Sequence, residues 1–179
     1  VDTAVADALE AAVKGQPGTI AAYKQEAKKQ NQPLAFALSD ITALASAKFG
    51  YSAEDVLNTC QALYETHKLT SYPRTDCAYL PESQHADAPR VLEAIKHVNP
   101  ELAGLVDGAD PRIKSKTWDD SKITAHHGIV PTMQKGSKAA LSERERNIYD
   151  LIVRTYLAQF YPLHEFMQTT VGVEIAGEN

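Results

Sequence analysis

Apolar residues recur at intervals of three and four along most of the chain, which is the pattern of helices with one buried face. The clearest case begins at Ser142, which is predicted to form a capping box with Glu145. Ile148, Leu151 and Ile152 then follow on one helical face. Glycine, proline and capping residues delimit the other helices. The helices predicted in this way cover residues 3–14, 40–49, 52–67, 83–98, 100–106 and 142–160. The centre of the chain is therefore predicted to be mainly α.

Both ends of the chain depart from this helical pattern. Residues 171–175 alternate apolar and polar side chains, which is typical of a strand. Residues 19–30 are ambiguous, because their alanines and lysines favour a helix while their apolar face is thin. A lone terminal strand needs partners for its backbone groups. We therefore interpret residues 1–32 and 163–179 as short pieces of an adjoining β-containing domain, and residues 33–162 as the helical domain.

The overall charge and the cysteine count narrow the function classes. The 179-residue chain has a formal net charge of −5, which argues against a dedicated nucleic-acid-binding domain with a strong basic patch. No uninterrupted apolar run is long enough to span a bilayer, so no membrane contact is expected. Cys60 and Cys77 are too few for a disulfide framework. They are expected to be free thiols in a reducing compartment, which indicates a cytoplasmic protein.

One stretch, Leu-Thr-Ser-Tyr-Pro-Arg-Thr-Asp at residues 69–76, combines side chains that suit phosphate chemistry. Pro73 disfavours helical geometry at Tyr72 and favours an extended backbone there. In an extended segment, Tyr72 and Arg74 share one face. A phenol hydroxyl beside a guanidinium fork is suited to meeting a phosphate. The preceding predicted helix leads directly to this segment and would give the tyrosine a rigid support.

A second unusual stretch, Asp-Asp-Ser-Lys-Ile-Thr-Ala-His-His-Gly-Ile-Val-Pro-Thr, occupies residues 119–132. Its adjacent histidines, His126 and His127, invite interpretation as a metal site. Neighbours on an extended segment point to opposite faces, however, so chelation by both is not expected. Asp119 and Asp120 suggest a magnesium site, but a solvated loop or a cap is the simpler interpretation. We therefore predict no metal site in this chain.

Together these two stretches resemble the type IA DNA topoisomerases. Residues 63–81 look like that family's active-site tyrosine motif, and residues 119–132 look like its second motif. Both are closer to the topoisomerase III form, and Pro73 and His127 disfavour the topoisomerase I form. The resemblance covers about residues 33–165. It implies a helical tyrosine-bearing domain, with short β segments of the family's gate domain at both ends.

The resemblance implies that Tyr72 is the nucleophile. It would attack a phosphodiester of single-stranded DNA, forming a 5′-phosphotyrosine bond and releasing a 3′-hydroxyl. After strand passage, the hydroxyl attacks back and reseals the break, which gives relaxation or decatenation without ATP, because the covalent intermediate conserves the bond energy.

The other implied roles belong to residues near that tyrosine. A phenol has a reference pKa of about 10, so ionising it at neutral pH costs about 4 kcal/mol. Arg74 is expected to offset part of this cost and to clamp a phosphate oxygen. His126 is expected to support the phosphate or Arg74, with Asp76 holding the imidazole. Ser121 and Lys122 are candidates for contacts with the DNA backbone.

The resemblance also implies a part of the enzyme that this sequence lacks. The family's acidic magnesium site belongs to a separate toprim domain, and no convincing toprim pattern occurs here. The expected partners are therefore single-stranded DNA and the remaining domains of the same bacterial enzyme. Mg²⁺ is expected in the missing toprim domain and not in this fragment, which alone should neither cleave nor relax DNA.

A second interpretation keeps the fold without the chemistry. The chain would then be a non-catalytic helical module that binds single-stranded DNA or a protein partner, and the acidic net charge mildly favours it. The role of Tyr72 distinguishes the two interpretations, because only the enzyme needs its hydroxyl.

Overall fold

The computed structural model describes residues 2–178, which contain six α-helices and one two-stranded antiparallel sheet. This confirms the mainly α fold class, with β structure confined to the two ends. The chain divides into two compact units. One combines the stretch up to Gln30 with the stretch from His164 onward, and the other is Asn31–Leu163. The assignment of these parts to a gate domain and a tyrosine-bearing domain stays a prediction.

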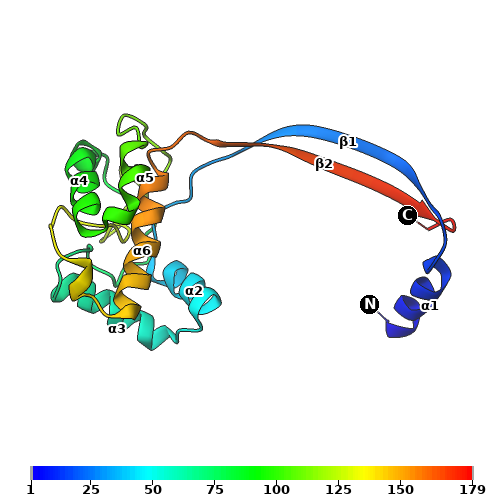
Figure 1. Ribbon diagram of the computed structural model, residues 1–179, viewed down its shortest axis with the longest axis horizontal. Helices are drawn as coiled ribbons and strands as arrows, with labels where there is room; N and C mark the ends of the chain where they lie inside the picture. The colour runs from blue at the N-terminus through cyan, green and yellow to red at the C-terminus, as the bar shows by residue number, and fades with distance from the viewer. Residues whose placement is uncertain (1, 179) are drawn as a thin grey trace. The chain divides into compact units, whose positions relative to one another are not determined.

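The first unit consists of helix α1 (Thr3–Val13) and strands β1 (Gly18–Gln30) and β2 (His164–Ile175) (Figure 1). β1 and β2 pair in antiparallel register from Gly18 opposite Ile175 to Gln30 opposite His164. The ambiguous stretch at residues 19–30 is thus a strand, although its alanines and lysines favour a helix. Backbone hydrogen bonds to a partner far along the sequence outweigh that local preference. The strand predicted at residues 171–175 is confirmed and begins earlier, at His164.

The second unit holds five helices: α2 (Leu38–Phe49), α3 (Ala53–Glu65), α4 (Ala88–Val98), α5 (Ala103–Asp107) and α6 (Glu143–Ala158). α6 packs against α2 and α3, and α4 packs against α5 (Figure 1). A short 3₁₀ helix at Glu82–Asp87 precedes α4. The core of this unit comes mainly from α3, α4 and α6, and its fully buried side chains include Ile41, Val56, Leu63, Leu80, Ile95, Ile129, Ile148, Ile152 and Phe160.

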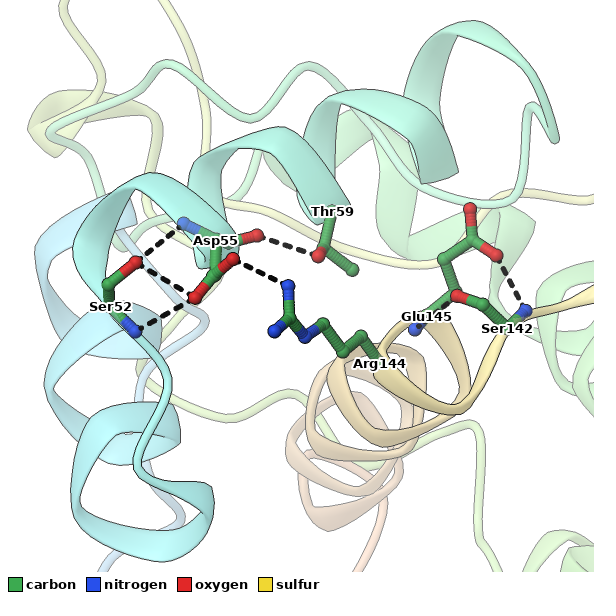
Figure 2. A network of polar contacts seen from close by, with 6 residues as sticks. All are labelled: Ser52, Asp55, Thr59, Ser142, Arg144 and Glu145. Atoms are coloured by element: carbon green, nitrogen blue, oxygen red, sulfur yellow. Dashed lines mark hydrogen bonds and ion pairs between the residues drawn. The ribbon is translucent and has the colours of Figure 1, made fainter.

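Two capping boxes fix where α3 and α6 begin, and one ion pair joins them (Figure 2). The backbone N–H of Asp55 donates to the hydroxyl of Ser52, and that of Glu145 donates to the hydroxyl of Ser142. Each carboxylate accepts in return from the backbone N–H of its capping residue. Arg144 links the two helix starts by donating to Asp55 at 2.5 Å. The N-termini of two packed helices are therefore connected by side chains that also cap them.

Glu145 connects the start of α6 to the end of α3 as well. Its carboxylate lies 3.1 Å from Nε2 of His67, and both side chains are largely buried. Partial burial acts to raise the pKa of Glu145. Together, the hydrogen bonds with Ser142 and His67 lower the pKa more than burial raises it, so the pKa of Glu145 lies below its ordinary value. The carboxylate form is therefore the one that the folded state favours.

Replacing Glu145 with Gln should make stability less dependent on acidity. A carboxylate whose pKa is lowered by folding contributes stability above its unfolded-state pKa, and the contribution disappears as pH falls through the folded-state value. Gln can still serve the capping box but does not titrate. We expect the Tm advantage of the wild type over Glu145→Gln at pH 7 to shrink as pH falls below about 4.5. Thermal denaturation across this pH range measures it.

The matched control is Glu143→Gln, which removes an exposed carboxylate from the same helical turn. A Tm difference between wild type and Glu145→Gln that stayed constant from neutral to acidic pH would contradict the pKa assigned to Glu145.

Candidate active site

The two unusual stretches, 69–76 and 119–132, lie side by side and are joined by hydrogen bonds at Ser71. The Ser71 backbone N–H donates to the carbonyl of Val130 at 2.9 Å, and the Ser71 hydroxyl donates to the carbonyl of Gly128 at 3.1 Å. The backbone N–H of Val130 donates back to the Ser71 hydroxyl at 3.0 Å. These bonds lie next to Tyr72. Residues 119–132 therefore directly support residues 69–76, which we call the tyrosine segment.

Gly128 allows this close approach. A Cβ atom at this position would lie 2.9 Å from the Cβ of Ala35, closer than two side chains pack without one of them shifting. The backbone N–H of Gly128 also donates to the carbonyl of Tyr79 at 2.8 Å. At Gly128, the second stretch therefore fits between the chain before α2 and Tyr79, which follows the stretch 69–76.

A reversal of the chain after α3 brings the tyrosine segment back along that helix. Lys68 has a φ of 57°, in the left-handed region that most side chains avoid. The next backbone N–H, that of Leu69, donates to the carbonyl of Leu63 at 2.9 Å. The segment then leaves helical geometry, and the N–H of Leu38 donates to the carbonyl of Thr75 at its far end. Both ends of the segment are thus attached to helices.

Tyr72 is half-buried between two aromatic rings. Its ring centroid lies 5.6 Å from that of Tyr64 in an edge-to-face arrangement and 4.9 Å from that of His126 in a tilted one. Lys68 lies on the Tyr64 ring, with Nζ 5.8 Å from the centroid. These contacts orient the phenol without enclosing it in the hydrocarbon core. The structure thus brings together the predicted nucleophile and the histidine of the second stretch.

Arg74 is exposed beside the same helix. Its Nε donates to Oε1 of Gln61, on α3, at 3.2 Å. Pro73, between the two candidate residues, is buried. Tyr72 contacts α3 through Tyr64, and Arg74 contacts it through Gln61. Both side chains therefore contact the same helix, as expected for residues two apart in an extended segment.

Asp76 is exposed and lies with Arg74 along an open groove of about 1070 Å³ beside α2 and the start of α3. The hydrogen bonds found within residues 2–178 include none between Asp76 and His126. The expected support of His126 by Asp76 is therefore not part of this arrangement. In this conformation, the ring of His126 instead lies against the ring of Tyr72.

The predicted DNA-contacting residues lie on an exposed 3₁₀ turn, Asp120–Lys122. The hydroxyl of Ser121 donates to Asp119 at 2.6 Å, so it is already engaged in a cap. The carbonyl of Lys122 is 3.6 Å from Sγ of Cys77, which places this turn next to the end of the tyrosine segment. The geometry brings the turn near the site, but within residues 2–178 no hydrogen bond or ion pair joins it to Tyr72 or Arg74.

His127 has different neighbours from His126. Its Nδ1 lies 2.8 Å from the carbonyl of Gly128, and its Nε2 lies 3.3 Å from the side-chain nitrogen of Gln84. It lines a cavity of about 240 Å³ together with Ser71 and Trp118. These contacts give His127 a packing role.

Within the part of the chain that the structure describes, no group of three or more His, Cys, Asp or Glu side chains is placed to hold a metal ion. Asp119 and Asp120 instead accept hydrogen bonds from the backbone N–H groups of Ser121 and Glu82. The two aspartates therefore act as local caps.

Two residues of the site were not singled out from sequence, Gln61 and Tyr64. Both lie on α3, three residues apart, and Glu65 follows four residues after Gln61. Residues at such spacings are neighbours on a helix surface. This spacing was the sequence signal that could have placed Gln61, Tyr64 and Glu65 together.

A helical unit that presents a tyrosine beside an arginine and a histidine, on two hydrogen-bonded segments, defines a class that the comparisons with known proteins identify. The family model described as "DNA topoisomerase" matches residues 2–179, and the chain belongs to that family. This confirms the resemblance seen in the sequence.

The particular relatives are enzymes named DNA topoisomerase 3. The protein from Vibrio cholerae is 43% identical over 171 residues, which are 96% of this chain and 26% of that protein. The one from Bacillus licheniformis is 36% identical over 179 residues, covering 99% of this chain and 24% of its own length. The chain thus spans about a quarter of these relatives, and it is similar to the topoisomerase III branch, as predicted.

A solved structure supports the fold independently. Full-length topoisomerase I from Thermotoga maritima superposes with a TM-score of 0.60 at 20% identity, covering 95% of this chain and 29% of that one. At this identity the likeness shows the fold alone. Among the described residues, no helix combines the length and the apolar character needed to cross a membrane.

Proposed function

We propose that this chain is the tyrosine-bearing part of an ATP-independent type IA DNA topoisomerase that cleaves single-stranded DNA, passes a strand and reseals the break. The observation that carries the proposal is the position of Tyr72. Its half-buried ring lies against His126, and the segment that carries it is hydrogen-bonded to the second motif. Arg74 is exposed on the same side of α3.

In the proposed reaction, the phenol oxygen of Tyr72 attacks phosphorus, and the bond from phosphorus to the 3′ oxygen breaks. The 5′ phosphate stays on the tyrosine, the phenol proton is lost, and the 3′ oxygen leaves as a hydroxyl after taking up a proton. Arg74 balances charge on the phosphate oxygens, and His126, beside the phenol ring, supports the phosphate or Arg74. Resealing runs the same step backward.

The family's magnesium ion belongs, in this proposal, to a domain outside this chain. The described residues offer no acidic cluster that suits Mg²⁺, whose preferred ligands are carboxylate oxygens. The proposed partners are single-stranded DNA and the other domains of the same enzyme, acting on DNA in the bacterial cytoplasm. Ser121 and Lys122 keep their proposed role as contacts for the DNA backbone, and Asp76 keeps its role as support for His126 once DNA is bound.

The fragment alone should be inactive, and this tests the proposal. We expect the purified 179-residue chain to give no Mg²⁺-dependent relaxation of supercoiled plasmid and no covalent DNA adduct. The full-length protein that contains it should give both. Gel electrophoresis of plasmid topoisomers and of a labelled oligonucleotide measures the two activities. Mg²⁺-dependent relaxation by the fragment, or no adduct with the full-length protein, would contradict the proposal.

The net charge of −5 favours a second candidate, a non-catalytic module that binds single-stranded DNA or a protein. Such a module would bind its partner equally well with or without the Tyr72 hydroxyl, and it would form no covalent bond to DNA.

A further inference from the structure

A chain of two hydrogen bonds runs from α3 to Arg74 through Gln61. Oε1 of Gln61 accepts from Nε of Arg74 at 3.2 Å, and Nε2 of Gln61 donates to Oε1 of Glu65 at 2.7 Å. Gln61 is half-buried, whereas Arg74 and Glu65 are exposed. The amide thus stands between a cation and an anion, at the edge of the proposed active site.

The chemistry of the three side chains determines which atom of the Gln61 amide faces each neighbour. A guanidinium has five N–H donors and no acceptor, so only the amide oxygen of Gln61 can face Arg74. The amide nitrogen is then left to donate, and it meets the carboxylate of Glu65, which accepts only. Each bond has one ionised partner, and such bonds are stronger than bonds between neutral groups.

The bond uses Nε and leaves the two terminal nitrogens of Arg74 for another partner. Within residues 2–178, Arg74 forms no ion pair with a carboxylate, so its charge is not neutralised by a direct partner. A guanidinium held at Nε presents its two outer nitrogens as a fork, the geometry that matches two oxygens of a phosphate.

We propose that Gln61 is a positioning residue, which holds Arg74 with its fork free to meet the DNA phosphate that Tyr72 attacks. This inference rests on the proposed function. Glu65 supports Gln61 from one helical turn further along α3 and fixes the orientation of the amide. Without Gln61, the long arginine side chain would have to be ordered by the substrate itself, at a cost in rotamer freedom during the reaction.

The test uses the full-length protein and a labelled single-stranded oligonucleotide. We expect Gln61→Leu to slow covalent adduct formation about tenfold, which is the scale of losing one hydrogen bond to a charged group. Leu has a similar size but no acceptor for Nε of Arg74. The dissociation constant for the oligonucleotide, measured without cleavage in the Tyr72→Phe background, should change by less than about twofold, because Gln61 itself does not contact the substrate.

Gln61→Asn separates positioning from packing. It keeps a neutral amide with an acceptor for Arg74, so we expect adduct formation at least about threefold faster than in Gln61→Leu. The matched control is Asn58→Leu, an exposed position on the same helix one turn earlier, which should leave the rate unchanged. If Gln61 served only to pack, the protein would tolerate Leu, which has a similar size, better than the shorter Asn.

The outcomes are distinct. A slow Leu variant together with a faster Asn variant supports the positioning role. Equal rates for the two variants, or a loss explained entirely by weaker DNA binding, would overturn it while leaving the proposed function intact. Absence of any adduct with the wild-type protein would contradict the proposed function, and the role of Gln61 with it.

Discussion

Tyr72→Phe in the full-length protein is expected to abolish the covalent adduct with single-stranded DNA entirely. Phe keeps the ring and therefore the contacts with Tyr64 and His126, but it lacks the oxygen that would bond to phosphorus. Because no other atom of the side chain can replace that nucleophile, the loss should be complete and not merely a reduced rate. Denaturing gel electrophoresis of a labelled oligonucleotide after incubation with protein and Mg²⁺ measures the adduct.

Two neighbouring tyrosines provide the controls. Tyr64→Phe removes a hydroxyl beside the Tyr72 ring, and Tyr79→Phe removes one just beyond residues 69–76. Both variants should still form the adduct, because only the Tyr72 oxygen is the proposed nucleophile. An adduct with Tyr72→Phe would refute the assignment. Unchanged DNA binding by all of these variants, with no adduct even for the wild type, would favour the non-catalytic module.

Leu63→Ala should destabilise the helical unit by about 3 kcal/mol, the scale of deleting a fully buried leucine side chain. Leu63 has 0% of its surface exposed, and it lies on α3 one residue before Tyr64. The substitution leaves a cavity between α3 and the rest of the core, which close packing cannot refill without strain. Denaturant unfolding of the 179-residue chain, followed by the helical circular dichroism signal, measures the free energy of unfolding.

Leu44→Ala is the matched control, because it removes the same atoms from a side chain on α2 that is 41% exposed. Its effect should stay below about 1 kcal/mol, since less apolar surface returns to water. If the two variants unfolded with the same free energy, α3 would not be anchored through Leu63, and the support for the tyrosine segment would have to come from elsewhere.

The helices were predictable where the determinants are local. Ser52 with Asp55 and Ser142 with Glu145 signal their own capping boxes, because each pair sits three residues apart and meets as soon as a helix begins. Strand β1 was not predictable from local determinants. Its alanines and lysines favour a helix, and its partner, β2, lies at the other end of the sequence.

The candidate site shows the same division between local and long-range determinants. Pro73 indicates by itself that Tyr72 is not helical. The meeting of Tyr72 with His126 followed from resemblance to a family and not from any local pattern. Gln61 was missed because its partner, Arg74, lies thirteen residues later (74 − 61), and only the left-handed backbone at Lys68 turns the chain back toward α3.

The pairing of β1 with β2 has a consequence for how the protein is built. Because Gln30 and His164 face each other in the ladder, the chain leaves the ribbon and returns to it at the same rung. In topological terms, the whole stretch Asn31–Leu163 takes the place that a few turn residues occupy in an ordinary hairpin. Such an arrangement is that of an inserted module, and the register of the two strands does not depend on the length of the chain between them.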